Sequence, residues 1–597
     1  MNIANGIESI YKEREDFIII GLTGRTGSGC TTVSKILSTE LFDDLSLKHP
    51  KETDFSSNSE RKYQIIYNYA RKHWNPFYRI SMTDIIFSFI LHNTYDEFMY
   101  ILEGVVGKSV TDKLKISIED KYKSLTEEFN YLHDKILQNI TEDWNLERHD
   151  RNKLADEYEL LFKLPSVQSK FREIMQNLNY TYKDNHGNMV KANAFTYCLQ
   201  EFGNRIRHHG SIIENENFTG KHMFAIARRA NDFIKAVRYI NNTNLRPTFI
   251  CLDAIRNPYE ATYFQDRYAS FFLIAVSTDN DERIRRLGEN FDNQQIKALD
   301  KTEYPRKLTG SQKFSNQDIG ACSQIADIYL YNPRENTNGK YFISKLVVTY
   351  VTLIKHPGLI TPTNVERCMQ IAYNAKLNSG CLSRQVGAVI TDSNYSIKAV
   401  GWNSVAEGQV PCNLRNVENL IVNKDGDSFS TFEIENDEFT KYISDKYSKI
   451  LKNEECKLAL NGRLCSYCFK DEYGNITGQK NQVHTRSLHA EENAFLQIVK
   501  YGGEGIKGGK LFTSASSCVL CSKKAFQLGI KDIYYIDPYT DIANAHILSF
   551  GKDKKHCPQC HLFYGAIGRA YTCLYTQRIA IKDELESLIF SKDRKSE

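Results

Sequence analysis

The clearest pattern of apolar and polar positions lies toward the C-terminal end of the chain, where helical and strand periodicities alternate. Apolar residues recur at helical spacing over residues 490–499. Residues 510–513 then predict a short strand, and residues 518–528 predict a second helix. Residues 530–536 are apolar and aromatic enough for a buried strand. We therefore expect this part of the chain to fold as helix, strand, helix, strand.

A second pattern, nearer the N-terminus, predicts a parallel α/β sheet. Residues 17–22 form a short buried-strand run that leads into a glycine-rich loop and then an apolar helix at 33–41. Further strand-like runs follow at 248–252 and 271–277. The intervening residues 45–245 carry a charged helical pattern, which predicts a helical insertion within this domain.

Length and composition fit two domains. The 597 residues exceed one ordinary domain, and the 41% apolar content is sufficient for several packed cores. Asn-Pro and Asn-Gly pairs mark a junction between Asn332 and Lys340, so we expect domains at 1–340 and 341–597. A net charge of +4 is small for a dedicated nucleic-acid-binding protein. With neither a secretory segment nor a membrane-length apolar run in the sequence, the expected location is cytoplasmic.

The candidate chemistry of the C-terminal pattern centres on His489, Cys518 and Cys521. Three such ligands are what a catalytic zinc ion requires, because its fourth position must hold a water that loses a proton near neutral pH. Glu491, two residues beyond the histidine, can lie beside the metal without ligating it and is the predicted proton carrier. Both cysteines lie at the predicted start of a helix, where the helix dipole favours thiolate. These four residues point to hydrolytic deamination of a nucleobase.

The glycine-rich loop after the first strand has the spacing of a phosphate-binding loop, a strand followed by Gly-x-x-x-x-Gly and a helix. The predicted nucleotide-binding residues are Gly24, Gly27, Gly29, Thr31 and Asp253. Cys30 stands where a lysine would neutralise the β- and γ-phosphates, whereas Thr31 stands where a hydroxyl ligand of Mg²⁺ belongs. We therefore expect a degenerate site that can bind a nucleotide with Mg²⁺ but does not transfer a phosphoryl group efficiently.

Three segments resemble the deoxycytidylate deaminase branch of the cytidine deaminase superfamily. They are Cys381–Ile390, Gly401–Asn403 and His489–Ala494. The resemblance covers about residues 360–580. It implies a three-layer α/β/α domain in which a helix at 364–378 precedes a hairpin, and it implies free deoxycytidine nucleotides, dCMP or dCTP, as substrates.

The same resemblance assigns two substrate contacts. Asn403 follows the second strand of the hairpin and is expected to hydrogen-bond the sugar. Arg384 is assigned to the phosphate, with a surface arginine at a strand edge as the alternative. The family usually has proline before the first metal cysteine, where this chain has Ser517. Serine can cap a helix at that position, so we expect the change to be tolerated.

The cysteines suggest a second metal site. Fifteen cysteines in a cytoplasmic chain indicate metal binding rather than disulfides. Two further Cys-x-x-Cys pairs could form a closed structural zinc site from Cys465, Cys468, Cys557 and Cys560. The competing set is Cys381, Cys412 and His484, because some deoxycytidylate deaminases carry a second zinc near those positions. A third alternative is that these thiols bind no metal.

Residues 253–258 resemble the segment after the Walker-B-like strand of nucleotide and dephospho-coenzyme A kinases, and the basic helix around 283–286 continues that resemblance. A P-loop kinase-like domain ahead of such a deaminase is similar to bacterial anti-phage enzymes that deplete nucleotides. The resemblance implies an enzyme that a small RNA holds inactive until infection. Resemblance to free-nucleotide deaminases also implies a homo-oligomer.

Three hypotheses follow from the sequence. The first is hydrolytic deamination of free deoxycytidine nucleotides, which the form of residues 386–403 favours. The second is a deaminase of RNA or single-stranded DNA, which needs an aromatic and basic channel beside the pocket. The third is a nucleotide or RNA sensor in which the deaminase domain is only a scaffold; the complete set of ligands with Glu491 argues against it.

Overall fold

The computed structural model describes residues 3–139, 151–183, 189–214, 217–305, 308–334, 336–479, 482–502, 505–536, 543–551 and 554–593. The chain forms two compact units, one of residues 1–361 with 569–597 and the other of residues 362–568. The predicted junction at 340/341 falls inside helix α16 (Thr337–Lys355). Asn336, which looked like part of a linker, is the N-cap of this helix, since its side chain accepts a hydrogen bond from the Gly339 amide at 2.8 Å.

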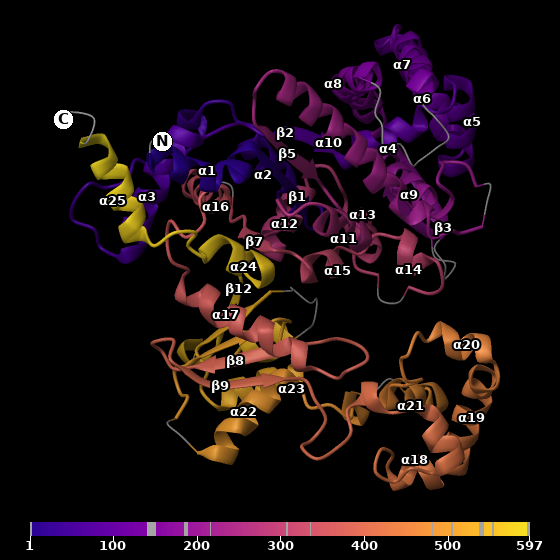
Figure 1. Ribbon diagram of the computed structural model, residues 1–597. Helices are drawn as coiled ribbons and strands as arrows, with labels where there is room; N and C mark the ends of the chain where they lie inside the picture. Colours follow the sequence, from indigo (N-terminus) through magenta and orange to yellow (C-terminus); the bar gives the residue numbers. More distant parts are fainter. Residues whose placement is uncertain are drawn as a thin grey trace. The chain divides into compact units, whose positions relative to one another are not determined.

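A parallel sheet forms the centre of the N-terminal unit (Figure 1). The strands of this unit follow the order β7 (Ile328–Tyr331), β6 (Phe271–Ser277), β1 (Phe17–Thr23), β5 (Thr248–Asp253) and β2 (Tyr78–Ser81) across the sheet. β1 is hydrogen-bonded in parallel to both β5 and β6, and every residue of β5 is buried. Full burial explains why β1, β5 and β6 were visible in the sequence as continuous apolar runs.

The loop after β1 leads into helix α2 (Cys30–Leu37), which contacts both β1 and β5. Gly24, Gly27 and Gly29 all have positive φ, at 156°, 87° and 109°. At Gly29 a Cβ would also lie 1.9 Å from the side-chain nitrogen of Asn332, so only glycine fits there. The carboxyl end of β1 therefore turns sharply into a helix, which is the arrangement the sequence predicted.

The helical insertion begins later than expected, because β2, which pairs with β5, lies within the predicted range of 45–245. The sequence did not reveal β2, a four-residue strand that carries an exposed arginine. The insertion follows β2 and carries a short hairpin of β3 (Asn179–Lys183) and β4 (Met189–Asn193). Its helices are α4 (Met82–Ile90), α5 (Tyr95–Val106), α6 (Lys108–Lys121), α7 (Leu125–Asn139), α8 (Arg151–Met175), α9 (Ala194–His209) and α10 (Ala225–Thr243).

The other helices of the N-terminal unit lie before, between and after these elements in the chain. They are α1 (Ile3–Asp16), α3 (Asn58–His73), α11 (Pro258–Arg267), α12 (Asn280–Leu287), α13 (Asn293–Glu303), α14 (Gln312–Ser315), α15 (Ile319–Gln324), α24 (Gly568–Tyr575) and α25 (Ile581–Asp593). α25 contacts α1, and Glu584 pairs with His356 at 2.9 Å. Within the described ranges, no helix is long and apolar enough to cross a membrane.

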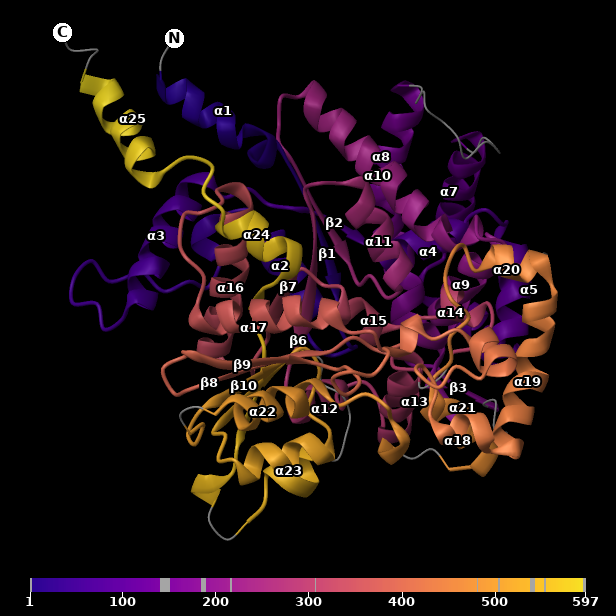
Figure 2. The same ribbon diagram turned by 60° about the horizontal axis from the view of Figure 1, so that its bottom comes forward.

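A five-stranded mixed sheet forms the C-terminal unit. Its order is β12 (Gln559–Leu562), β11 (Asp532–Tyr535), β10 (Lys510–Thr513), β8 (Gly387–Thr391) and β9 (Ile397–Trp402). β8 is antiparallel to β9 and β10, whereas β10, β11 and β12 run parallel. Helix α17 (Asn364–Ala375) covers one face, and α22 (Ala490–Tyr501) and α23 (Val519–Gln527) cover the other (Figures 1 and 2). This is the expected three-layer arrangement.

A helical segment between β9 and α22 carries its own small core. Its helices are α18 (Thr431–Glu435), α19 (Asp437–Lys452), α20 (Glu454–Ala459) and α21 (Phe469–Thr477). Phe429, Phe439 and Tyr467 pack together in its centre. The buried Arg415 and Glu433 form an ion pair there, and the Tyr467 hydroxyl donates to Glu433 at 2.7 Å. The attraction between the two charges and the hydrogen bond from the Tyr467 hydroxyl offset the cost of burying them.

Close packing of α22 on β9 depends on Gly401. A Cβ at this residue would lie 2.4 Å from the Ala490 carbonyl oxygen and 2.5 Å from the Ala494 nitrogen, both backbone atoms of α22. Backbone atoms cannot move aside as a flexible side chain can. The glycine therefore sets how closely the helix approaches the sheet.

We predict that Gly401→Ala destabilises the C-terminal unit by about 1–3 kcal/mol, because the added methyl group overpacks the contact between β9 and α22. Thermal unfolding followed by circular dichroism measures the effect. Gly426→Ala is the matched control, since a Cβ there has no neighbour within 4 Å. Equal melting temperatures for the two variants would contradict the prediction.

Candidate functional site

The predicted ligands His489, Cys518 and Cys521 meet at the beginnings of two helices. His489 is the N-cap residue of α22, and Cys518 is the N-cap residue of α23. Cys521 lies one turn further along α23 and is buried. Because α22 and α23 lie on the same face of the sheet, their first turns bring together residues that are about thirty positions apart in the chain.

The spacing of the three ligand atoms fits zinc. His489 Nδ1 lies 3.3 Å from Cys518 Sγ and 3.5 Å from Cys521 Sγ. Tetrahedral zinc, with bonds of about 2.0–2.3 Å, separates its ligand atoms by roughly 3.5 Å. The hydrogen bond from the Cys521 thiol is the main reason that the pKa of Cys518 falls to about 4; burial opposes this shift and His489 adds to it. Two sulfurs and one nitrogen leave a fourth position for a small ligand.

Glu491 lies in the first turn of α22 and is 4% exposed. Its Oε1 accepts hydrogen bonds from the hydroxyls of Thr513 and Ser517, both at 3.3 Å. Burial raises the pKa of the Glu491 carboxyl, and the Thr513 hydroxyl lowers it in part. A carboxyl shifted toward neutral pH and held beside a metal site is suited to accept and return protons.

Two residues that hold Glu491 were not identified from the sequence in that role. Thr513 ends strand β10, and a polar residue at the end of a buried strand was the available signal. Ser517 was expected to cap the second helix, but Cys518 occupies the N-cap position and the Ser517 hydroxyl donates to Glu491 instead. The serine in place of the usual proline therefore contacts the predicted proton carrier.

The predicted substrate contacts Arg384 and Asn403 lie on the two segments that flank the hairpin of β8 and β9, and the Asn403 side chain joins these segments. The Asn403 side chain accepts from the Val386 amide and donates to the Arg384 carbonyl, each at 2.7 Å. The next amide, that of Gly387, donates to the Ser514 hydroxyl at 3.0 Å, which ties the start of β8 to the turn before Cys518. One N–H of the Asn403 amide is left after these bonds.

The residues predicted to form a second zinc site do not lie together in the structure. Within the described residues, His489, Cys518 and Cys521 are the one group of three or more possible ligands that lie within 4.8 Å of one another. The pairs Cys465/Cys468 and Cys557/Cys560 lie on different parts of the unit. Cys465 packs in the core of the helical segment, whereas Cys560 lies on β12 opposite Ile533. The ligands of the competing set, Cys381, Cys412 and His484, do not lie within this distance of one another either.

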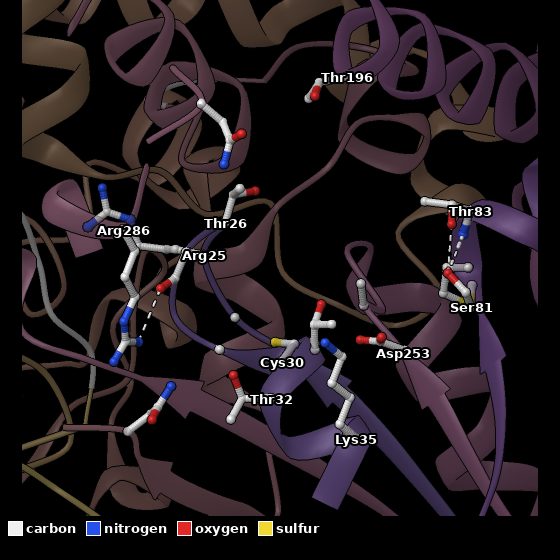
Figure 3. A pocket seen from close by; sticks show the side chains of 18 of the residues that line it. Arg25, Thr26, Cys30, Thr32, Lys35, Ser81, Thr83, Thr196, Asp253 and Arg286 are labelled. Atoms are coloured by element: carbon white, nitrogen blue, oxygen red, sulfur yellow. Dashed lines mark hydrogen bonds between the residues drawn. The ribbon is translucent and has the colours of Figure 1, made fainter. Parts of the chain in front are cut away.

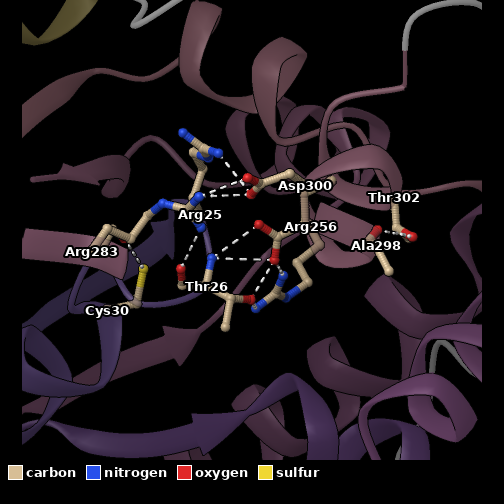
Figure 4. Close-up of polar contacts among 10 residues, drawn as sticks. Arg25, Thr26, Cys30, Arg256, Arg283, Ala298, Asp300 and Thr302 are labelled. Atoms are coloured by element: carbon tan, nitrogen blue, oxygen red, sulfur yellow. Dashed lines mark hydrogen bonds and ion pairs between the residues drawn. The ribbon is translucent and has the colours of Figure 1, made fainter. Parts of the chain in front are cut away.

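The predicted phosphate-binding loop lines a cavity of about 870 Å³ in the N-terminal unit (Figure 3). Gly24, Gly27, Gly29, Thr31 and Asp253 all line it, together with Cys30. The pKa of the Cys30 thiol (Figure 4) is raised to about 12, mainly by burial and next by the negative charge of the nearby Asp253. This side chain is therefore neutral at physiological pH. The position that would hold a lysine in a phosphate-transferring loop therefore carries no charge.

Comparison with known proteins places the C-terminal region in a family. Residues 362–537 match the model of the cytidine and deoxycytidylate deaminase zinc-binding region, and this region is a member of that family. The deoxycytidylate deaminase of Enterobacteria phage T2 is 27% identical over 172 residues, which are 29% of this chain and 78% of the phage protein. The deoxycytidylate deaminase of phage T4 is 26% identical over 197 residues, 32% of this chain and 89% of that protein.

Among solved structures, the dCMP deaminase of cyanophage S-TIM5, determined with dCMP and dUMP, is 21% identical. The match covers 34% of this chain and 99% of the cyanophage chain, with a TM-score of 0.20.

We predict that Cys521→Ser lowers bound zinc from about one ion per chain to a small fraction, because two ligands hold the ion far less tightly than three. Metal analysis of the purified protein measures the change. Cys560→Ser is the control and is expected to keep its zinc, since Cys560 lies outside the ligand cluster. A second equivalent of zinc that disappears in Cys560→Ser would instead support the double Cys-x-x-Cys site.

Proposed function

We propose that the C-terminal unit deaminates free deoxycytidine nucleotides, dCMP or dCTP, to deoxyuridine nucleotides with release of ammonia. The observation that carries this proposal is the buried Glu491 carboxylate beside a cluster of two sulfurs and one nitrogen. That combination suits hydrolysis at a ring carbon bearing an amine, where one group must move protons between water, ring nitrogen and leaving ammonia.

Each residue has a distinct part in the proposed reaction. Zinc held by His489, Cys518 and Cys521 would supply the acidity of the attacking water. Glu491 takes a proton from this water and passes it to the ring nitrogen; the second proton of the water then leaves with ammonia. The hydroxyls of Thr513 and Ser517 hold Oε1 of Glu491, which fixes the carboxylate while its proton changes place.

The choice of substrate rests on Asn403 and Arg384, which the hydrogen bond from the Asn403 side chain to the Arg384 carbonyl holds together. The remaining N–H of Asn403 is available for the sugar, and Arg384 supplies positive charge for a phosphate. Partial burial, and to a smaller extent the charge of Arg384, lowers the pKa of the half-buried Lys376 to about 8, so two cationic groups lie close to each other here. Both phage relatives are named deoxycytidylate deaminases, which favours a free nucleotide over a polynucleotide.

The N-terminal unit is proposed to be a P-loop kinase-like domain that binds a nucleotide with Mg²⁺ and does not transfer phosphate. Support comes from the parallel sheet, the three positive-φ glycines and the neutral Cys30. By family resemblance, we further propose a cytoplasmic homo-oligomer that drains the deoxycytidine nucleotide pool in anti-phage defence and that a small RNA holds inactive.

We predict that Glu491→Gln lowers turnover of dCMP or dCTP by about 10²–10⁴-fold or more, because an amide cannot carry the proton. Zinc content should stay unchanged, since Glu491 is not in the ligand cluster. The assay measures ammonia and uracil-nucleotide formation by protein freed of nucleic acid, with dCMP, dCDP, dCTP, CTP and a cytosine-containing single strand as substrates.

The outcomes of this assay separate the three hypotheses. Activity confined to the single strand would replace the proposal with a polynucleotide deaminase. Turnover that survives in Glu491→Gln would refute the role of the carboxylate. Protein that holds zinc and converts none of the substrates would favour a sensor with a deaminase scaffold.

A further inference from the structure

An ion pair joins the two helices whose first turns bring the candidate zinc ligands together. Glu492 of α22 pairs with Lys524 of α23, and within the described part of the chain no other ion pair links these helices. Glu492 lies three residues beyond His489, and Lys524 lies three residues beyond Cys521. Residues three positions apart lie on the same side of a helix. The ion pair is therefore next to the ligand cluster, at the contact between the two helices.

The carboxylate of Glu492 also contacts a ligand residue directly. Its Oε1 accepts from the Lys524 ammonium group, and its Oε2 accepts from the backbone amide of His489 at 3.4 Å. The second contact belongs to the capping box that begins α22. One side chain thus connects the backbone of the nitrogen ligand to the helix at whose start both sulfur ligands lie.

Glu491 and Glu492 are adjacent in sequence but have different surroundings. A step of one residue turns a side chain by about 100° around the helix axis. Glu491 is buried and accepts from the hydroxyls of Thr513 and Ser517, whereas the side chain of Glu492 is 26% exposed and meets Lys524. The two carboxylates therefore have separate parts, because one lies inside the site and the other bridges two helices at its edge.

We infer that Glu492 and Lys524 are positioning residues, which hold the starts of α22 and α23 at the separation that a bound zinc ion needs. The inference rests on the zinc site of the proposed function. One ligand begins α22 and the other two lie on the first turn of α23, so separation of the helices would pull His489 away from both sulfurs. Contacts that orient ligands from outside the metal's own shell commonly affect how tightly it is held.

The test follows the transfer of zinc from the zinc-loaded full-length protein to an excess of a chromogenic chelator. Glu492→Gln keeps an acceptor for the His489 amide and removes the negative charge, whereas Lys524→Gln removes the positive charge. We expect each variant to release zinc roughly three- to tenfold faster than the unmodified protein, since a partly exposed pair is weaker than a buried one. The double variant should be no faster than either single variant, because both remove the same interaction.

Two variants serve as controls. Lys524→Arg keeps the positive charge and is expected to retain zinc as long as the unmodified protein does. Lys500→Gln removes a second ion pair of α22, the one with Glu407, which does not involve α23. The Lys500 and Lys524 side chains are 47% and 44% exposed, so the two lysines are matched in exposure. Zinc release from Lys500→Gln should be unchanged.

Salt tests the ion pair without a substitution at Glu492. Raising NaCl to about 1 M screens charges that are partly exposed. Zinc release from the unmodified protein should therefore accelerate with salt more steeply than release from Lys524→Gln, in which the pair is already absent.

Equal release rates for the unmodified protein, Glu492→Gln and Lys524→Gln would overturn the inference and leave the zinc site intact. Additive effects in the double variant, or an equal acceleration in Lys500→Gln, would overturn it too. If the unmodified protein binds no zinc, the zinc site fails and the inference fails with it. A protein that holds zinc, releases it as expected and deaminates no nucleotide would contradict the proposed function alone.

Discussion

The close approach of α22 to β9 is the constraint on which the catalytic unit depends. Gly401 permits backbone-to-backbone packing, and this packing fixes where the first turn of α22 begins. His489 and Glu491 both lie at the start of α22, so one contact places the proposed metal ligand and the proposed proton carrier together. Because the start of α23 lies on the same face of the sheet, the sulfurs of Cys518 and Cys521 lie beside His489 and complete the group of three candidate ligands. Precise placement of this kind is what catalysis at a metal requires.

In the N-terminal unit, the loop after β1 departs from the phosphate-transferring pattern in its charge rather than in its backbone geometry. Its glycines have positive φ in a tight turn before a helix, which is the backbone that the proposed phosphate site requires. The charge that normally accompanies it is absent from position 30 and is distributed over side chains from several helices. A binding role is compatible with such a diffuse field, whereas phosphoryl transfer needs a cation fixed at the transferred group.

The sequence predicted the strands and helices that carry the sites because these elements have strong periodicity. β6 and β10 have the predicted bounds, and β1 and β5 each end one residue later than predicted. The sequence did not predict β2, because four residues are too few to show a pattern. The predicted domain junction was also wrong, because Asn336 caps a helix there. Cysteines were grouped by motif alone. Cys-x-x-Cys gives a local spacing, but whether two such pairs meet depends on tertiary contacts that no single sequence displays. Thr513 and Ser517 were missed because each contacts Glu491 from 22 or 26 positions away in the sequence.

The last helices of the chain belong to the first unit. α25 contacts α1, and Glu584 reaches His356, so the N-terminal unit is discontinuous in sequence, with the whole C-terminal unit inserted into it. During synthesis the ribosome therefore completes the inserted unit before it releases the helices that finish the first one. The deaminase unit can fold while its host still lacks a part of its own surface, and a chain truncated after residue 568 loses a segment of the N-terminal unit rather than a dispensable tail.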